Sequence, residues 1–335
     1  MVVIMKPDAS ESDVTGVLER IKRYGMDAHL SRGKERTIIG IIGDEREIDF
    51  DSIAALPGVE RAMPLLRPYK YVSRSVHPEN KVVAVGEVEI GKAPVFIAGP
   101  CSVEEEDATL RIAEEVQRAG AQIFRGGAYK PRTSPWTFQG LREKGLKILS
   151  KVKRATGLPI VTEVMDTSDI DLVGQHADVY QVGMRNMRNY ALLSKLGKTR
   201  KPVLLKRGDS AKIEEWLAAA DYIVRNGNEN VILCERGIRT FEDFTRNTLD
   251  LNAVVAAKME SCLPVLVDPS HGTGRADMVL AMSRAAVAAG ADGLVLEVHF
   301  DPDKAWSDGM QTITPEALRK LILACKEIHA VSSRT

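Results

Sequence analysis

The feature that most constrains the fold is a repeat that begins near Pro94. Each repeat holds a short apolar run, then a polar or glycine-containing loop, then an amphipathic segment such as 108–119. An apolar run without polar alternation is typical of a parallel strand that is buried on both faces. Such runs occur at residues 95–98, 121–124, 159–162, 179–182, 202–205, 230–233, 264–267 and 293–296.

Eight strand–helix units in about 240 residues predict an α/β fold, a (β/α)8 TIM barrel, over residues 93–335. The alternative is an open doubly wound sheet. That fold would more naturally carry a Gly-x-Gly-x-x-Gly turn after its first strand. Here the first run is followed by Gly99-Pro100-Cys101-Ser102 instead, so we favour the barrel.

Residues 1–70 follow a different rhythm. A helix is expected to open at Ser10, because a capping hydroxyl precedes an acidic first turn. Strand-like runs and a second short helix complete a βαββαβ order, which predicts a small ferredoxin-like domain. The ranges are a strand at 2–5, strands at 26–30 and 37–42, a helix near 48–56 and a strand at 59–66. Residues 71–92 are expected to form a linker and a hairpin that covers the bottom of the barrel.

Composition excludes several classes of partner. Lys+Arg and Asp+Glu both number 46, so there is no global positive field for nucleic acid. The apolar runs are too short to span a membrane. Residues 1–6 lead into an acidic helix pattern, so we expect no secretory signal. The four cysteines lie far apart, which favours a reducing compartment, the cytoplasm.

Cations gather at the ends of the predicted strands. The loop after the second run carries three cations beside Gly126 and Gly127, and such a loop suits a phosphate or carboxylate. Carboxyl ends of barrel strands converge on one mouth. Several anionic groups are therefore expected there, because like charges around one cavity are costly without them. The expected cations are Arg125, Lys130, Arg132, Arg185, Lys206 and Arg236.

A second set of side chains at the same mouth could bind a metal. A lone buried cysteine is more often a small hydrophobe, and a lone histidine is more often not a ligand. In a barrel, however, the first, seventh and eighth strands are neighbours. The set therefore predicts one divalent ion such as Fe, Mn, Zn or Co. Its members are Cys101, His271, Glu297 and Asp308, with Glu163, Glu235, Asp268 and His299 as expected outer partners.

Several motifs resemble one enzyme family. Three of them are similar to motifs of the 3-deoxy-D-arabino-heptulosonate 7-phosphate (DAHP) synthases. They are Ala98-Gly-Pro-Cys-Ser102, Arg125-Gly-Gly-Ala-Tyr-Lys-Pro-Arg-Thr133 and Val267-Asp-Pro-Ser-His271. The resemblance is to the short microbial type with an N-terminal ferredoxin-like (ACT-like) regulatory domain. The sister octulosonate 8-phosphate synthases typically carry Lys-Ala-Asn-Arg-Ser where this chain has Lys-Pro-Arg-Thr.

The resemblance implies an activity. Phosphoenolpyruvate, erythrose 4-phosphate and water would give DAHP and phosphate, the first step of the shikimate pathway. It also implies feedback inhibition by tyrosine or phenylalanine at the N-terminal domain and a homotetramer. Met184 departs from the pattern, which has alanine there. The residues that match the family's metal ligands are Cys101, His271, Glu297 and Asp308, and those that match its substrate sites are Arg125, Lys130, Arg132, Thr133, Arg185, Lys206 and Arg236.

The expected catalytic groups are Lys130 as the acid for the aldehyde oxygen, Glu163 or a metal-bound hydroxide as the base for water, and the ligands Cys101 and His271. Three alternatives stay open at this point. The first is octulosonate synthase activity, and the second is a Schiff-base aldolase that uses Lys206. The third is a non-catalytic sensor of aromatic acids.

Overall fold

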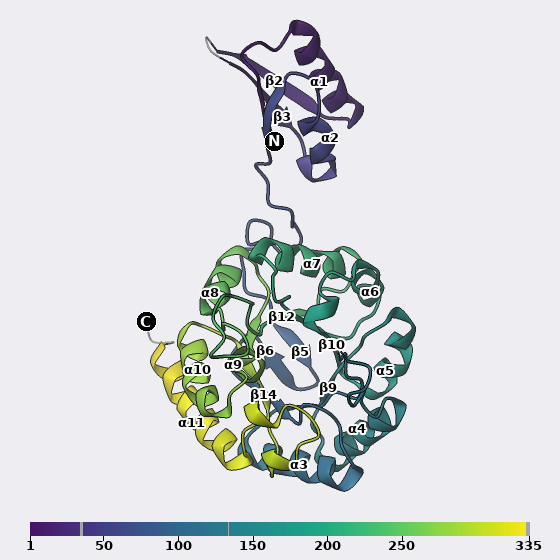
Figure 1. The fold of residues 1–335 in the computed structure, drawn as a ribbon, viewed down its shortest axis with the longest axis vertical. Coiled ribbons are helices and arrows are strands. Elements are labelled where there is room, and N and C mark those ends of the chain that lie inside the picture. The colour runs from purple at the N-terminus through teal and green to yellow at the C-terminus, as the bar shows by residue number, and fades with distance from the viewer. Residues whose placement is uncertain (34–35, 133, 333–335) are drawn as a thin grey trace. The chain divides into compact units, whose positions relative to one another are not determined.

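The computed structural model describes residues 1–33, 36–132 and 134–332. The chain divides into two compact units, Met1–Pro68 and Tyr69–Thr335. Figure 1 colours the chain from one terminus to the other. Within the described residues, none of the helices has the length and the hydropathy that a membrane crossing requires.

The first unit is an antiparallel sheet with two α-helices. The strands lie in the order β2-β3-β1-β4, which is the ferredoxin-like order that the βαββαβ pattern predicts. Ser10 caps α1 as expected, since its hydroxyl accepts the Asp13 N–H at 3.2 Å and the Asp13 carboxylate accepts the Ser10 N–H at 2.8 Å. The elements are β1 Val2–Met5, α1 Glu11–Arg23, β2 Asp27–Arg32, β3 Thr37–Ile42, η1 Glu45–Glu47, α2 Phe50–Ala54 and β4 Val59–Met63.

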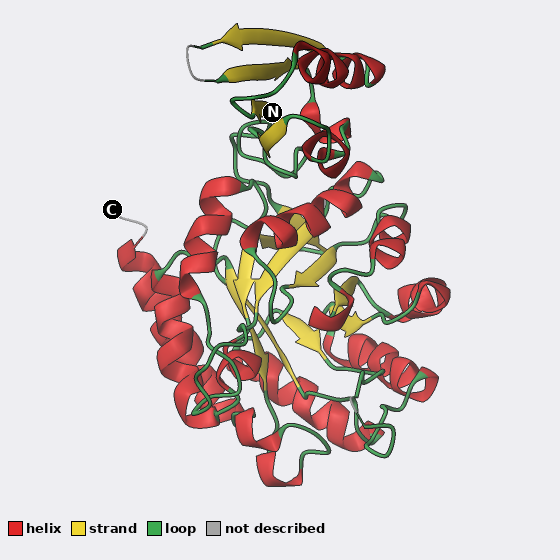
Figure 2. Cartoon of the chain, turned by 45° about the horizontal axis from the view of Figure 1, so that its top comes forward, coloured by secondary structure: helices red, strands yellow, loops and turns green. Residues whose placement is uncertain are grey.

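The second unit is a closed barrel of eight parallel strands, with helices around it (Figure 2). All eight predicted runs form strands, so the predicted barrel is confirmed. Three strands begin one residue after Pro159, Pro202 and Pro264, because proline has no N–H for a strand ladder. The strands are β7 Val95–Gly99, β8 Ile123–Arg125, β9 Ile160–Glu163, β10 Val179–Val182, β11 Val203–Lys206, β12 Val231–Glu235, β13 Val265–Val267 and β14 Gly293–Glu297.

The helices of this unit lie mostly between successive strands. The α-helices are α3 Glu106–Ala119, α4 Glu143–Thr156, α5 Ile170–His176, α6 Tyr190–Leu196, α7 Ile213–Arg225, α8 Leu251–Glu260, α9 Pro269–Thr273, α10 Ala276–Ala288 and α11 Pro315–Ser332. The 3-10 helices are η2 Thr167–Asp169, η3 Met184–Asn186, η4 Pro302–Lys304 and η5 Gly309–Gln311.

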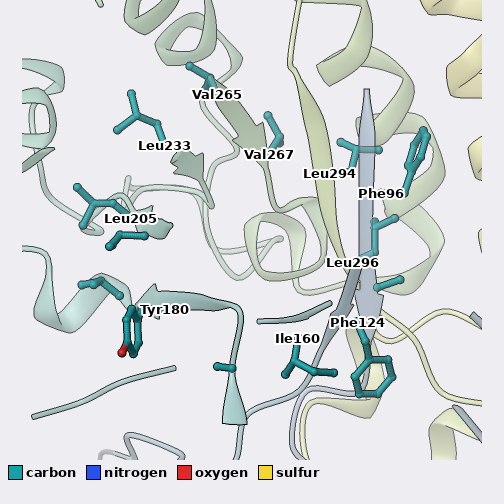
Figure 3. Packing of buried hydrophobic residues seen from close by; sticks show 14 of the residues in the cluster. Phe96, Phe124, Ile160, Tyr180, Leu205, Leu233, Val265, Val267, Leu294 and Leu296 are labelled. Atoms are coloured by element: carbon teal, nitrogen blue, oxygen red, sulfur yellow. The ribbon is translucent and has the colours of Figure 1, made fainter. Parts of the chain in front are cut away.

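Two hydrophobic clusters stabilise the barrel. The outer one joins strands to helices and includes Phe96, Phe124 and Leu205, which Figure 3 shows among its neighbours. The inner one fills the barrel and includes the hairpin of β5 (Val83–Val85) and β6 (Val88–Ile90). In Figure 1 this hairpin lies at the centre of the ring of helices. Because the inner side chains fill one end, the polar chemistry is confined to the other.

Candidate active site

The carboxyl ends of the barrel strands surround a cavity of about 370 Å³. Gly99 permits the close approach of β7 and β8 at this end, because a Cβ there would overlap the Arg125 carbonyl oxygen. The structure brings all six predicted cations to the cavity wall and adds a seventh, Arg246. The cations of the wall are Arg125, Lys130, Arg132, Arg185, Lys206, Arg236 and Arg246.

Two of these cations already have buried carboxylate partners. Arg125 donates to the Glu297 carboxylate at 2.6 Å, and both side chains are almost fully buried. Lys206 Nζ lies 2.5 Å from Asp268 Oδ2, again out of water. Since Asp268 holds Lys206 Nζ in this buried ion pair, the geometry does not favour the Schiff-base alternative at this position.

Two buried donors of residues that line the cavity have no protein acceptor. Buried Arg125 Nε and Arg236 Nη1 make no hydrogen bond within the described residues. Burial also lowers the pKa of Arg236, although the Asp268 charge opposes that shift. A buried guanidinium N–H without an acceptor is costly, so an anionic ligand would satisfy these donors.

Three predicted metal ligands meet beside the cavity. One ligand atom each from Cys101, His271 and Glu297 lies within 4.8 Å of the others. The fourth predicted ligand, Asp308, contacts Cys101, whose Sγ–H donates to Oδ2 at 2.7 Å. His271 Nδ1 donates to Asp268 at 2.7 Å, which leaves Nε2 as the free lone pair, 3.3 Å from Glu297.

The charges of the site shift the acidity of the ligands. Burial, followed by the Glu297 charge, raises the pKa of the Cys101 thiol to about 12. Burial also acts to raise the pKa of Glu297, but the positive charge of surrounding side chains, Arg125 among them, outweighs burial and lowers that pKa to about 2. A buried thiol beside carboxylates loses its proton readily only when a metal ion binds the sulfur.

The two predicted acid–base groups both line the cavity. Lys130 Nζ donates to the Cys101 carbonyl at 3.0 Å and to its sulfur at 2.8 Å. Glu163 accepts from Gln181 at 3.2 Å, and burial raises the pKa of its carboxyl group. Lys130 therefore lies beside the candidate metal ligands, and Glu163 carries a carboxyl group that is poised closer to neutral pH.

The expected outer partners divide into two groups. Asp268 contacts both His271 and Lys206, as predicted. Glu235 instead accepts from Arg207 at 2.9 Å, and His299 pairs with Glu104 at 3.1 Å. For these two residues the expected contact with metal ligands or lysines is wrong, because other buried partners, Arg207 and Glu104, take their polar atoms.

Sequence reasoning missed three cavity or ligand contacts. Arg246 lies on the β12–α8 loop and donates to Asp308 at 3.1 Å and to Gln311 at 2.9 Å. Gln311 donates to Glu297, and Gln181 lines the cavity. None of these three directly follows a strand, so the rule used for the other cations did not apply to them.

The structure describes two of the three remaining predicted positions. Met184 lines the cavity, so its side chain takes space where the family pattern has alanine. Thr133 lies outside the described residues. Arg132 lies at the cavity wall with its guanidinium 3.8 Å from Asp308.

The fold and the cavity together define a (β/α)8-barrel protein whose mouth is built for a multiply anionic ligand. Residues 75–332 match the model of the DAHP synthetase I family, and residues 1–67 match that of the DAHP synthase ferredoxin-like domain. The chain belongs to the DAHP synthetase I family.

Named relatives agree with this assignment. The chain is 48% identical to phospho-2-dehydro-3-deoxyheptonate aldolase of Thermotoga maritima, over 98% of this chain and 97% of the relative. The crystal structure of that DAHP synthase covers 99% of this chain and 98% of its own, with a TM-score of 0.94. The 2-dehydro-3-deoxyphosphooctonate aldolase of Syntrophotalea carbinolica is 33% identical over 72% of this chain and 93% of the relative.

Proposed function

We propose that this protein is a DAHP synthase, a transferase that condenses phosphoenolpyruvate with erythrose 4-phosphate and water. The observation that carries the proposal is the cavity at the barrel mouth, whose wall holds seven cations. The two substrates bring two phosphates and one carboxylate. The seven cations outnumber the three carboxylates that pair with them, Glu297, Asp268 and Asp308, so positive charge is left for that anionic load.

We assign the substrate sites to the cations of the cavity wall. Arg236 and Arg185 would hold the phosphate of phosphoenolpyruvate, supported by the unpartnered Arg236 Nη1. Arg132 would hold the phosphate of the aldehyde substrate, and Thr133 would assist it. Arg125, Lys130 and Lys206 would complete the phosphoenolpyruvate site.

One divalent metal ion fits the described residues. The thiol, the imidazole and the carboxylate lie close enough to share an ion, and this mixed donor set suits Mn, Fe, Zn or Co. Asp268 holds the imidazole so that its Nε2 lone pair is free. When bound by Cys101, His271, Glu297 and Asp308, the ion would supply Lewis-acid polarisation of the aldehyde carbonyl.

The protein's own groups would perform the proton transfers. As carbon 3 of phosphoenolpyruvate attacks the aldehyde, Lys130 would donate a proton to the aldehyde oxygen. Water then adds at carbon 2, and Glu163 would take its proton. The raised pKa of the Glu163 carboxyl group supports this role. The carbon 2 hydroxyl would then become the keto group as the carbon–oxygen bond to phosphate breaks, its proton would leave with the phosphate, and Arg185 and Arg236 would hold that phosphate.

A phosphate-release assay tests the activity. With phosphoenolpyruvate present, we expect release with erythrose 4-phosphate and far less with arabinose 5-phosphate. The reverse preference would indicate octulosonate synthase activity, the function in the names of the more distant relatives. If no phosphate were released with either aldehyde, the sensor alternative would be favoured. A covalent substrate adduct on Lys206 that borohydride traps would favour the Schiff-base aldolase.

We further propose that the ferredoxin-like unit regulates the enzyme by binding tyrosine or phenylalanine, and that the protein is a homotetramer. A truncated form of the Thermotoga maritima synthase covers 78% of this chain, which supports a barrel that folds without the unit. Deletion of residues 1–68 should leave turnover and remove inhibition by aromatic amino acids. Inhibition that persists after the deletion would refute the regulatory role.

We also propose that the protein is cytoplasmic. All four cysteines are free thiols, which supports the cytoplasm as the location.

A further inference from the structure

A buried cluster outside the cavity involves groups that the proposed mechanism does not use. Glu104 lies on the β7–α3 loop, and its side chain is 4% exposed. His299 follows β14 and is 2% exposed. Their side chains meet at 3.1 Å between Glu104 Oε2 and His299 Nε2. A buried carboxylate is retained only when its oxygens are satisfied.

The hydrogen bonds define the form of the imidazole. The Asp301 N–H donates to His299 Nδ1 at 2.8 Å. Nδ1 is therefore the acceptor, so Nε2 carries the proton and donates to Glu104. The other carboxylate oxygen, Glu104 Oε1, accepts the Trp306 N–H at 2.8 Å. Glu104 thus holds the β14–α11 loop at two points, His299 and Trp306.

This loop delivers the fourth candidate metal ligand. Asp308 follows Trp306 by two residues and has a φ of 55°, a left-handed conformation that is uncommon for a residue other than glycine. Such a conformation persists when the surrounding structure holds it. Ser307, which lies between Trp306 and Asp308 in the sequence, forms a hydrogen bond of 2.9 Å between its hydroxyl and that of Ser102, the neighbour of Cys101.

The same anchor reaches the substrate side of the loop. The Trp306 ring packs edge to face on Phe138, with 5.2 Å between the ring centres. The Phe138 carbonyl accepts a hydrogen bond from Arg132 at 3.3 Å. Three loops at the barrel mouth, β7–α3, β8–α4 and β14–α11, therefore share one set of contacts that begins at Glu104.

We propose that Glu104 is a positioning residue, which acts with His299 to hold the β14–α11 loop so that Asp308 reaches the ligand set of Cys101. The inference rests on the metal site of the proposed function. Neither side chain lines the cavity, so Glu104 acts on the metal through Asp308 and not by contact with substrate.

The test is a titration of Co²⁺ into the metal-free full-length protein, followed by the absorption of the thiolate–Co²⁺ bond. Residues that orient metal ligands typically change metal affinity by about 10- to 100-fold. We expect a rise of that size in the Co²⁺ dissociation constant for Glu104→Ala. Glu104→Gln keeps an acceptor for the Trp306 N–H, but its amide N–H group would face the Nε2–H of His299, so that hydrogen bond is lost. The Co²⁺ dissociation constant of Glu104→Gln should therefore lie between those of wild type and Glu104→Ala.

A double-mutant cycle separates positioning from general damage. If Glu104 acts through Asp308, then Glu104→Ala should weaken Co²⁺ binding no further in an Asp308→Ala background. The matched control is Glu105→Gln, because Glu105 is the exposed neighbour and makes no side-chain cap hydrogen bond. Its Co²⁺ affinity should equal that of wild type. Thermal unfolding checks each variant, and Glu104→Gln serves if the alanine variant does not fold.

Each outcome has a defined meaning. Wild-type affinity in both Glu104 variants would overturn the positioning role while leaving the metal site intact. An equal loss in the presence and absence of Asp308 would also overturn it, since the effect would then not pass through that ligand. Wild-type protein that binds no Co²⁺ would overturn the metal site of the proposed function, and this inference with it.

Discussion

Replacing Asp268 with asparagine tests the electrostatic organisation of the site most directly. Asp268 Oδ2 accepts from Lys206 Nζ at 2.5 Å and from His271 Nδ1 at 2.7 Å, while Oδ1 accepts the His271 N–H at 2.9 Å. Asp268→Asn keeps the shape and can keep the contact of Oδ1. It places an N–H donor where Oδ2 faced two other donors, so the Lys206 ammonium and the imidazole both lose their acceptor.

The size of the effect follows from burial. The side chains of Lys206 and Asp268 are 5% and 1% exposed, so water cannot replace the lost contacts. A hydrogen bond to a charged group contributes about 1.5–3 kcal/mol, and removal of one partner of a buried ion pair costs about 3–5 kcal/mol. We expect the free energy of unfolding to fall by about 3–5 kcal/mol. Loss of the imidazole's partner should also weaken metal binding by about 10- to 100-fold.

Urea unfolding in chelator measures the first quantity, and Co²⁺ titration of the folded variant measures the second. The control is Asp277→Asn, because Asp277 pairs with Arg275 at 2.8 Å but its side chain is 66% exposed. Water screens the charges of an exposed pair, so this substitution should change the unfolding free energy little. If Asp268→Asn lowered the unfolding free energy by no more than this control and left the Co²⁺ affinity unchanged, the argument from buried charge would be refuted.

Three further predictions follow from the site. Arg236→Met should raise the KM for phosphoenolpyruvate about 10- to 100-fold, since a charge-assisted contact is lost. The KM for erythrose 4-phosphate should stay nearly constant, and an equal rise in both KM values would contradict the assignment of Arg236 to phosphoenolpyruvate. In metal-free protein the pKa of Glu297 is lowered to about 2, so its stabilising contribution is present above the ordinary carboxyl range and is lost as pH falls toward 2. The difference in unfolding free energy between wild type and Glu297→Gln should therefore narrow from pH 7 to pH 3, and a constant difference would refute this. Exhaustive chelation should abolish phosphate release and Mn²⁺ or Co²⁺ should restore it, except in Cys101→Ala; full activity in chelator would exclude the metal role.

Much of the fold was predictable because its signals are local. A continuous apolar run or the Ser10 cap acts within a few residues, and each predicted run contains or overlaps a strand of the barrel. In a closed barrel, successive strands are neighbours and the last strand pairs with the first, so the strand order follows from the order along the chain. That is why the cations after Phe124 and Leu205 could be assigned to one mouth from the sequence.

Contacts between distant loops were not predictable in this way. Arg246 enters the cavity wall from a loop with no strand-end signal, and Glu104 meets His299 across 195 positions of sequence. Which cations carry an internal carboxylate partner also depends on the side-chain directions at the barrel mouth. The sequence by itself determined the strands, their closure and the chemical groups at their ends. Only the tertiary structure decided which of those groups neutralise one another and which are left for a ligand, because that depends on distances of a few ångströms between separate loops.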